Sequence, residues 1–296
     1  MLVALVIFRI VRLNSVVQRW HQIPPLSLGF VIILLGLAIW ARAARFAELL
    51  GIPAMSLWNP AAGYSLACLV LPGGIGEFTL PMYLKPFGIT AAEGITVAVI
   101  TRLADVAISA VLVVLLFPML HQVPGTILVW AAASAAGLTL TLAVLLWHPR
   151  RPTKPQILVH RALHRWHWIG RYIEPALTML SRVSKKTSVR IILLTMAWKL
   201  LNAMMYWEFA EALSLGIRFI QICNAMLIYS LLLVLPLPSL AGFGASEAWW
   251  ILSFRAEGIK LSHAVVAALT FHVGNLFAVT VLGILPMIRT FLRFSH

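Results

Sequence analysis

The sequence predicts an all-α, polytopic integral membrane protein, built as an inverted repeat with two opposed re-entrant helical hairpins. Three observations lead to this fold class. Of the 296 residues, 61% are hydrophobic and 11% are charged, whereas about a quarter of the residues in soluble domains are charged. Several apolar stretches reach the ~20 residues that a membrane-crossing helix requires. Finally, one short pattern that contains ionisable residues occurs in both halves of the chain.

The repeated pattern begins at Glu77 and at Glu247. Each glutamate is followed, at the same distances in both halves, by a base, a Gly-Ile pair and two further polar residues. These members are Lys85, Gly88-Ile89, Arg102 and Asp105 in the first half, and Arg255, Gly258-Ile259, His272 and Asn275 in the second. Ionisable groups are costly within a membrane, and equivalent ones in two halves of a chain indicate a transport site. We therefore assign these residues to a substrate or proton pathway.

Five stretches are long and apolar enough to cross a bilayer. They cover residues 26–49, 90–120, 126–147, 190–215 and 261–288. We expect an N-terminal repeat in residues 1–148, a basic loop in 149–190 and a C-terminal inverted repeat in 191–296. The first 13 residues are apolar but short, so they form either a first span or an interfacial helix, and they lack the cleavage site of a signal peptide.

The basic residues predict the orientation. Ten of the 23 Lys and Arg residues lie between Arg150 and Arg190, which is typical of a cytoplasmic loop in the bacterial inner membrane. Residues 156–184 could form an amphipathic helix on the membrane surface. On this scheme helix 90–120 runs outward and helix 261–288 runs inward, with Arg42 and Arg45 on the cytoplasmic side. Because the positive charge gathers beside membrane spans, we do not expect nucleic acid as a partner.

Two pairs of shorter apolar segments predict the hairpins. Residues 53–71 pair with 75–87, and residues 219–235 pair with 245–256. Each pair is interrupted by Pro and Gly, and the tips contain Pro72, Gly73, Gly74 and Gly76, or Gly242 and Gly244. Broken backbone at membrane depth is tolerated only inside protein or beside an aqueous cavity. We expect Glu77 and Glu247 to lie just inside new helices and to approach each other near the bilayer midplane.

Each candidate residue also has a purely structural interpretation. Glu77 and Glu247 could cap the helices at the hairpin tips, because carboxylates favour helix N-termini. Arg102 and Asp105 could form a local ion pair; alternatively, Arg102 could hold a lipid phosphate. Lys85 and Arg255 could extend to the membrane interface.

Weaker candidates complete the set. These are Lys199, Glu208 and Glu211 within one span, and Trp249 and Trp250, which could line a lipid path. His160, His164 and His167 have helical spacing, but no acidic or Cys ligand accompanies them, so we expect no metal site and no cofactor.

These motifs resemble the lysylphosphatidylglycerol synthase transmembrane-region family over residues 26 to 290. The resemblance rests on the stretch Pro72 to Glu77 with Gly88-Ile89, Arg102 and Asp105, and on Gly242 to Glu247 with Gly258-Ile259. In the best-studied members this region is a flippase for an aminoacylated phospholipid and is fused to a soluble aminoacyl transferase. The resemblance therefore implies a flippase-like transporter rather than an enzyme, and it does not imply aminoacylation. Stand-alone members include a hopanoid-associated branch. This chain departs from the family at Leu80, where an arginine is common.

The function expected from these observations is translocation of a polar-headed lipid across the inner membrane. Its substrate would be an anionic or aminoacylated phospholipid, a polyprenyl lipid or a hopanoid. The alternative is a membrane-embedded enzyme for head-group or glycosyl transfer, with one glutamate as general base. A third interpretation is a partner subunit that recruits a lipid-synthesis enzyme, and a homo-oligomer is compatible with all three.

Overall fold

The computed structural model describes residues 23–116, 179, 183–233 and 243–294. Within these ranges every regular element is a helix and no strand occurs. Four of these helices are long and apolar enough to cross a membrane, namely α3 (Pro25–Leu50), α6 (Ala91–Leu116), α10 (Lys185–Ala212) and α13 (Leu261–Phe294). The predicted all-α, multi-pass membrane class is thereby confirmed. The predicted span 126–147, most of the basic loop and the N-terminal segment lie outside the described residues.

Local sequence signals explain where the long helices begin and end. Pro25 opens α3, where its missing N–H costs no hydrogen bond, and Gly51 ends the helix with a φ of 69°. Ser184 caps α10 by accepting a hydrogen bond of 3.0 Å from the backbone N–H of Thr187.

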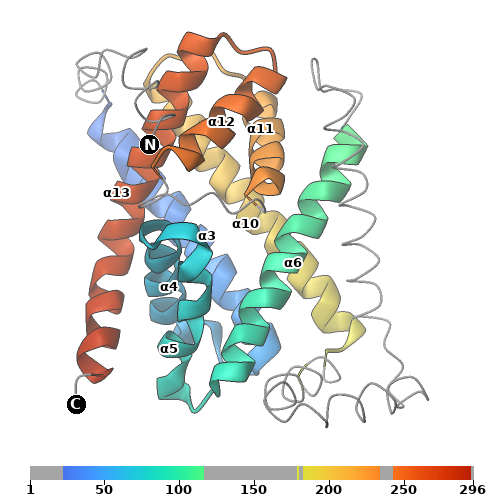
Figure 1. Ribbon diagram of the computed structural model, residues 1–296, viewed down its shortest axis with the longest axis vertical. Coiled ribbons are helices and arrows are strands. Elements are labelled where there is room, and N and C mark those ends of the chain that lie inside the picture. The colour runs from blue at the N-terminus through green and yellow to red at the C-terminus, as the bar shows by residue number, and fades with distance from the viewer. Residues whose placement is uncertain (1–22, 117–178, 180–182, 234–242, 295–296) are drawn as a thin grey trace.

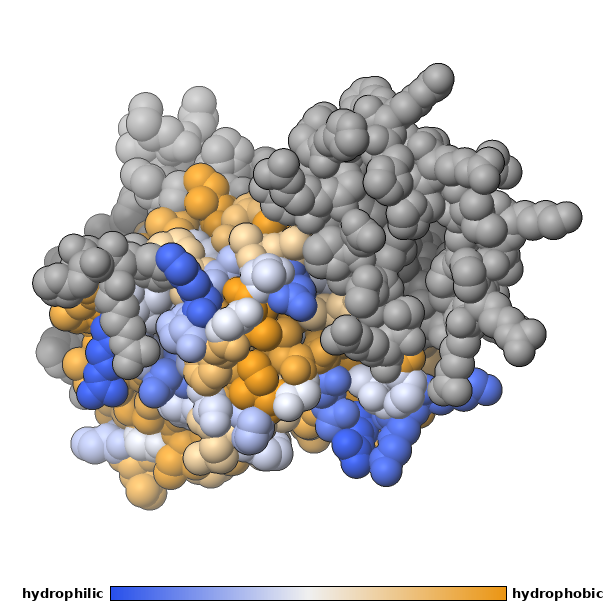
Figure 2. All heavy atoms as spheres, turned by 90° about the horizontal axis from the view of Figure 1, so that it is seen from below, coloured by the Kyte–Doolittle hydropathy of each residue, from blue (hydrophilic) through white to orange (hydrophobic). Residues whose placement is uncertain are grey.

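The long helices expose apolar side chains spaced three or four residues apart. On α3 and α13 they include Leu26, Phe30, Ile33, Leu37, Phe277, Val281, Leu285 and Ile288. The end-on view in Figure 2 shows extensive apolar surface around separate groups of hydrophilic residues. Soluble proteins rarely expose such continuous apolar area. These faces therefore suit contact with lipid.

Two groups of short helices lie between the long ones. The first comprises the 3₁₀ helix η1 (Ala54–Leu57), α4 (Trp58–Val70), η2 (Pro72–Thr79), α5 (Leu80–Leu84) and η3 (Lys85–Phe87). The second comprises α11 (Phe219–Leu232) and α12 (Ala245–Ala256). We predicted that segment 75–87 forms one new helix. In the structure this segment is instead divided among η2, α5 and η3. Pro81 and Pro86 stand at the starts of α5 and η3, where prolines lack the N–H that a continuous helix needs.

The two halves pack on each other in a crossed arrangement. Helix α3 lies along α10, while α4 packs against α13 and α11 packs against α6. Within each half, α5 contacts α6 and α12 contacts α13. In Figure 1, α6 runs away from α5 to the opposite end of the molecule, and α13 runs from α12 down to the C-terminus, so the two helices run in opposite directions.

The repeated Gly-Ile pairs mark equivalent turns before α6 and α13. Gly88 and Gly258 both adopt the left-handed conformation, with φ angles of 74° and 75°. Their N–H groups donate to the carbonyl oxygens of Lys85 and Arg255, each at 3.0 Å. Only glycine enters this region without a steric cost. The repeated base and the repeated glycine therefore belong to the same turn in both halves.

Gly76 is required by close packing of η2 against α4. A Cβ atom at this position would lie 2.7 Å from the backbone nitrogen of Cys68 and would also meet the Cα of Cys68 and the carbonyl oxygen of Ala67. Backbone atoms cannot move aside as a flexible side chain can. A larger residue at position 76 would therefore separate η2 from α4.

We predict that Gly76→Ala lowers the free energy of unfolding by about 1–3 kcal/mol, the usual cost of overpacking. The measurement is denaturant unfolding of the detergent-solubilised protein. Gly29→Ala is the matched control, because a Cβ at Gly29 meets no atom within 4 Å. That change should be neutral or slightly stabilising, and equal losses in both variants would contradict the close packing at Gly76.

Candidate functional site

A cavity of about 600 Å³ lies between the long helices and the two short groups. Six Arg, Lys, Asp and Glu side chains from the described residues line it: Arg42, Arg45, Glu77, Arg102, Asp105 and Lys199. Aromatic side chains share its wall, namely Phe46, Tyr64, Trp198, Tyr206, Tyr229 and Trp249. The cavity therefore combines charged groups with broad apolar surfaces, as ligand sites commonly do.

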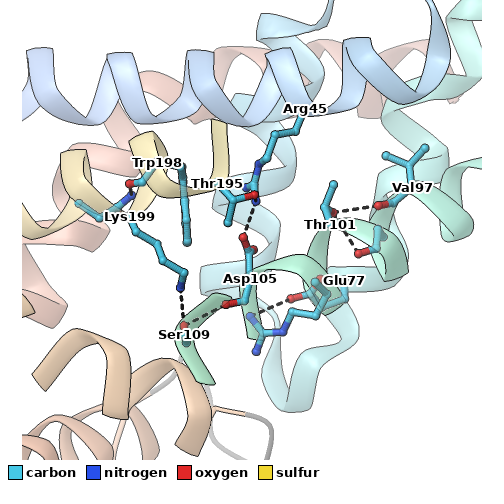
Figure 3. Close-up of polar contacts among 12 residues, drawn as sticks. Arg45, Glu77, Val97, Thr101, Asp105, Ser109, Thr195, Trp198 and Lys199 are labelled. Atoms are coloured by element: carbon cyan, nitrogen blue, oxygen red, sulfur yellow. Dashed lines mark hydrogen bonds and ion pairs between the residues drawn. The ribbon is translucent and has the colours of Figure 1, made fainter. Parts of the chain in front are cut away.

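A buried ion pair and a neighbouring hydroxyl group connect three of the helices at this cavity. Arg45 of α3 contacts Asp105 of α6 and also lies 3.3 Å from the hydroxyl of Thr195 on α10 (Figure 3). Arg45 is only 1% exposed. Asp105 thus turns to α3 and does not pair with Arg102, so the local ion pair considered for these two residues is wrong. Residues three apart share a helix face, but their partners come from other helices.

Lys199 of α10 is also buried beside this pair. Its Nζ donates to the hydroxyl of Ser109 at 2.6 Å, and that hydroxyl donates to the backbone carbonyl of Asp105 at 2.9 Å. Glu208 and Glu211, predicted on the same helix, do not line the cavity, and Glu211 is exposed. Of this group, only Lys199 belongs to the described cavity.

In the first half the repeated glutamate faces the cavity. Glu77 Oε2 accepts a hydrogen bond of 2.6 Å from the hydroxyl of Tyr64, and Oε1 lies 3.9 Å from the guanidinium of Arg102. Arg102 also reaches the carbonyl oxygen of Leu233 at 3.4 Å. About a third of the Glu77 and Arg102 side chains remains exposed. Both charges are therefore accessible from the cavity.

In the second half the equivalent glutamate is enclosed. Glu247 Oε2 accepts a hydrogen bond of 2.7 Å from the N–H of Gly244, at the start of α12, and Oε1 lies 3.3 Å from Nδ1 of His272. Phe243 stacks on His272 with ring centroids 4.4 Å apart. Glu247 and His272 are buried and do not line the described cavity. The predicted meeting of two glutamates in one pocket is therefore replaced by a capping contact, because the helix N-terminus attracts the carboxylate.

The equal spacing of the repeated residues nevertheless corresponds to an equivalent contact in the two halves. In both halves the glutamate contacts the residue 25 positions later, which is Arg102 in one and His272 in the other. The repeat thus encodes the same contact between a short segment and the following long helix. The first contact is open to the cavity, and the second is closed.

The remaining predicted residues lie in different places. Asn275 lines the cavity, while Lys85 and Arg255 are exposed, and Arg255 donates to the carbonyl of Ile259 at 3.1 Å. Trp249 lines the cavity, but Trp250 belongs to a buried aromatic cluster with Tyr206, Tyr229, Phe254 and Phe271. Of the hairpin-tip residues, Gly244 has a φ of 89° at the start of α12, whereas Gly242 lies outside the described residues.

Sequence reasoning missed Arg42, Arg45 and Trp198 as site residues. The two arginines served only as markers of the cytoplasmic side, yet both line the cavity. A signal was available, since they stand three residues apart within an apolar span. No group of three metal-ligating side chains occurs in the part of the chain that the structure describes, and the His160, His164 and His167 cluster lies outside it.

We predict that Asp105→Asn lowers the free energy of unfolding by about 3–5 kcal/mol, because it leaves the buried Arg45 charge without a carboxylate. Glu48→Gln is the matched control. It removes a carboxylate from α3 that forms an exposed 2.9 Å ion pair with Arg190, and such pairs contribute about 0–1 kcal/mol. Denaturant unfolding in detergent measures both changes. Similar losses would contradict the special role of the buried pair.

Comparison with known proteins shows that the sequence matches one protein family. A family model described as the lysylphosphatidylglycerol synthase TM region matches residues 1–283. No curated protein matches the chain, and no solved structure matches it either. The hopanoid-associated branch stays a prediction. Since the match extends over nearly all of the 296 residues, this multi-pass membrane protein belongs to the family of the lysylphosphatidylglycerol synthase transmembrane region, which is linked to lipid modification or translocation.

Proposed function

We propose that this protein is a translocase for a polar-headed lipid. The observation that carries the proposal is a cavity of about 600 Å³, lined by six Arg, Lys, Asp and Glu side chains, among helices whose outer faces are apolar. Ligand pockets for small molecules commonly measure about 300–1,000 Å³. A lipid head group would occupy the cavity while its acyl chains stay in the surrounding bilayer.

The crossed packing supports an inverted repeat and alternating access. Helix α4 of the first short group packs on α13, and α11 of the second packs on α6, while α6 and α13 run in opposite directions. Helices α4, α11 and α12 have 13, 14 and 12 residues, which is too short to cross a bilayer. In our proposal the short groups form two opposed re-entrant hairpins, and movement of one half against the other exposes the cavity to each side in turn.

Within this proposal the two halves have different tasks. Glu77 and Arg102 contact the head group, because both are partly exposed in the cavity. Asn275 adds a neutral polar contact from α13. Glu247 and His272 hold the start of α12 against α13. We place the protein in the bacterial cytoplasmic membrane, with residues 149–190 on the cytoplasmic side.

Reconstitution into liposomes tests the function. The full chain should accelerate the movement of fluorescent lipids between leaflets, measured by their accessibility to an impermeant quencher. Ser230 lines the cavity from α11. We predict that Ser230→Trp fills this space and slows translocation about tenfold or more, corresponding to about 1.4 kcal/mol in the barrier.

Leu200→Trp is the matched control, because Leu200 lies on α10 and is 52% exposed. This variant should translocate lipid at the original rate. Mass spectrometry of the same lipids distinguishes the enzyme alternative, which requires a covalent change. Failure to move any phospholipid, polyprenyl lipid or hopanoid would refute translocation, and a modified lipid would favour the enzyme.

A further inference from the structure

Three cations surround the ring of Trp198 on α10. The guanidinium carbons of Arg42 and Arg45 lie 5.1 Å from the ring centroid, and the Lys199 ammonium lies 5.7 Å from it. All four residues line the cavity. An aromatic face attracts cations, but it does not neutralise them. The wall formed by Arg42, Arg45, Trp198 and Lys199, which we call the cationic wall, therefore concentrates positive charge.

The carboxylates of the cavity do not balance this charge. Four basic and two acidic side chains line it among the described residues, which is a formal surplus of two positive charges. Asp105 is already paired with Arg45, and Glu77 is already paired with Arg102. Arg42 and Lys199 contact hydroxyl groups instead, at 2.8 Å to Ser65 and 2.6 Å to Ser109. A neutral hydroxyl accepts a hydrogen bond but supplies no countercharge.

The cationic wall also has hydrogen-bonding capacity to spare. The Nε atom of Arg45 is buried without a hydrogen-bond partner. Buried cations are costly unless they are paired. Both guanidinium and ammonium groups bind phosphate oxygens through charge-assisted hydrogen bonds. An anionic oxygen ligand in the cavity would supply the missing countercharge.

The geometry points to a binding site for a phosphate-bearing head group of net negative charge, with Arg42 and Lys199 as its principal contacts. This inference rests on the proposed function and narrows its substrate class. A zwitterionic head group gains less from the surplus charge. An aminoacylated head group adds an ammonium that the cationic wall repels, so the site discriminates against it.

Lipid binding to the full chain in detergent tests this inference. Phosphatidic acid, phosphatidylglycerol, phosphatidylethanolamine and lysyl-phosphatidylglycerol with identical acyl chains are compared by native mass spectrometry. The two anionic lipids should bind about tenfold more tightly than the other two, as expected for charge-assisted contacts. Inorganic phosphate in a separate titration distinguishes a lipid head group from a free phosphate, and it should bind more weakly than phosphatidic acid.

Three substitutions locate the site. Arg42→Gln should abolish the preference for anionic lipids, whereas Arg42→Lys should keep most of it because the charge is retained. Lys260→Gln is the control, since Lys260 is exposed and does not line the cavity. It removes one positive charge and should leave the preference unchanged. Thermal unfolding of each variant checks that the protein remains folded.

The outcomes separate this inference from the proposed function. Equal or tighter binding of the aminoacylated lipid overturns the inference, even if that lipid is translocated. Binding of inorganic phosphate as tight as that of phosphatidic acid overturns the assignment to a lipid head group. Anionic preference that depends on Arg42 supports the site, even if no lipid moves in liposomes and translocation is thereby refuted.

Discussion

The buried contact between Arg45 and Asp105 constrains the arrangement of the long helices. It joins α3 to α6, and the nearby hydroxyl of Thr195 brings in α10. Two charges in an apolar interior are stable only when each is held close to the other with good geometry. The helices cannot slide independently without exposing one of these charges to an apolar environment. The polar wall of the cavity is therefore a consequence of how α3, α6 and α10 are held together.

The two halves use one sequence pattern in two environments. In the first half Tyr64 and Arg102 contact Glu77 at the edge of the cavity, and all three residues line it. In the second half the N-terminus of α12 and His272 enclose Glu247. The same spacing thus produces an accessible ion pair on one side and a buried cap on the other. An asymmetric cavity with its charge concentrated in one half is the result.

The fold was predicted well wherever length and composition decide the outcome. The long helices α3, α6, α10 and α13 and the short helix α12 were expected close to their observed positions, because apolar stretches of this length must satisfy their backbone groups internally. The sequence also contained the information needed to predict that segment 75–87 is divided. Pro81 and Pro86 both oppose a continuous helix there.

The sequence by itself determined the membrane class, the long helices and the equivalence of Glu77 with Glu247. It also placed Arg102 and Asp105 on one helix face, because residues three apart lie together. Only the tertiary structure decided that Asp105 pairs with Arg45 and that Glu247 turns away from the cavity. Spacing along one helix says which side chains share a face, whereas the partner of a buried charge depends on which other helix packs against that face.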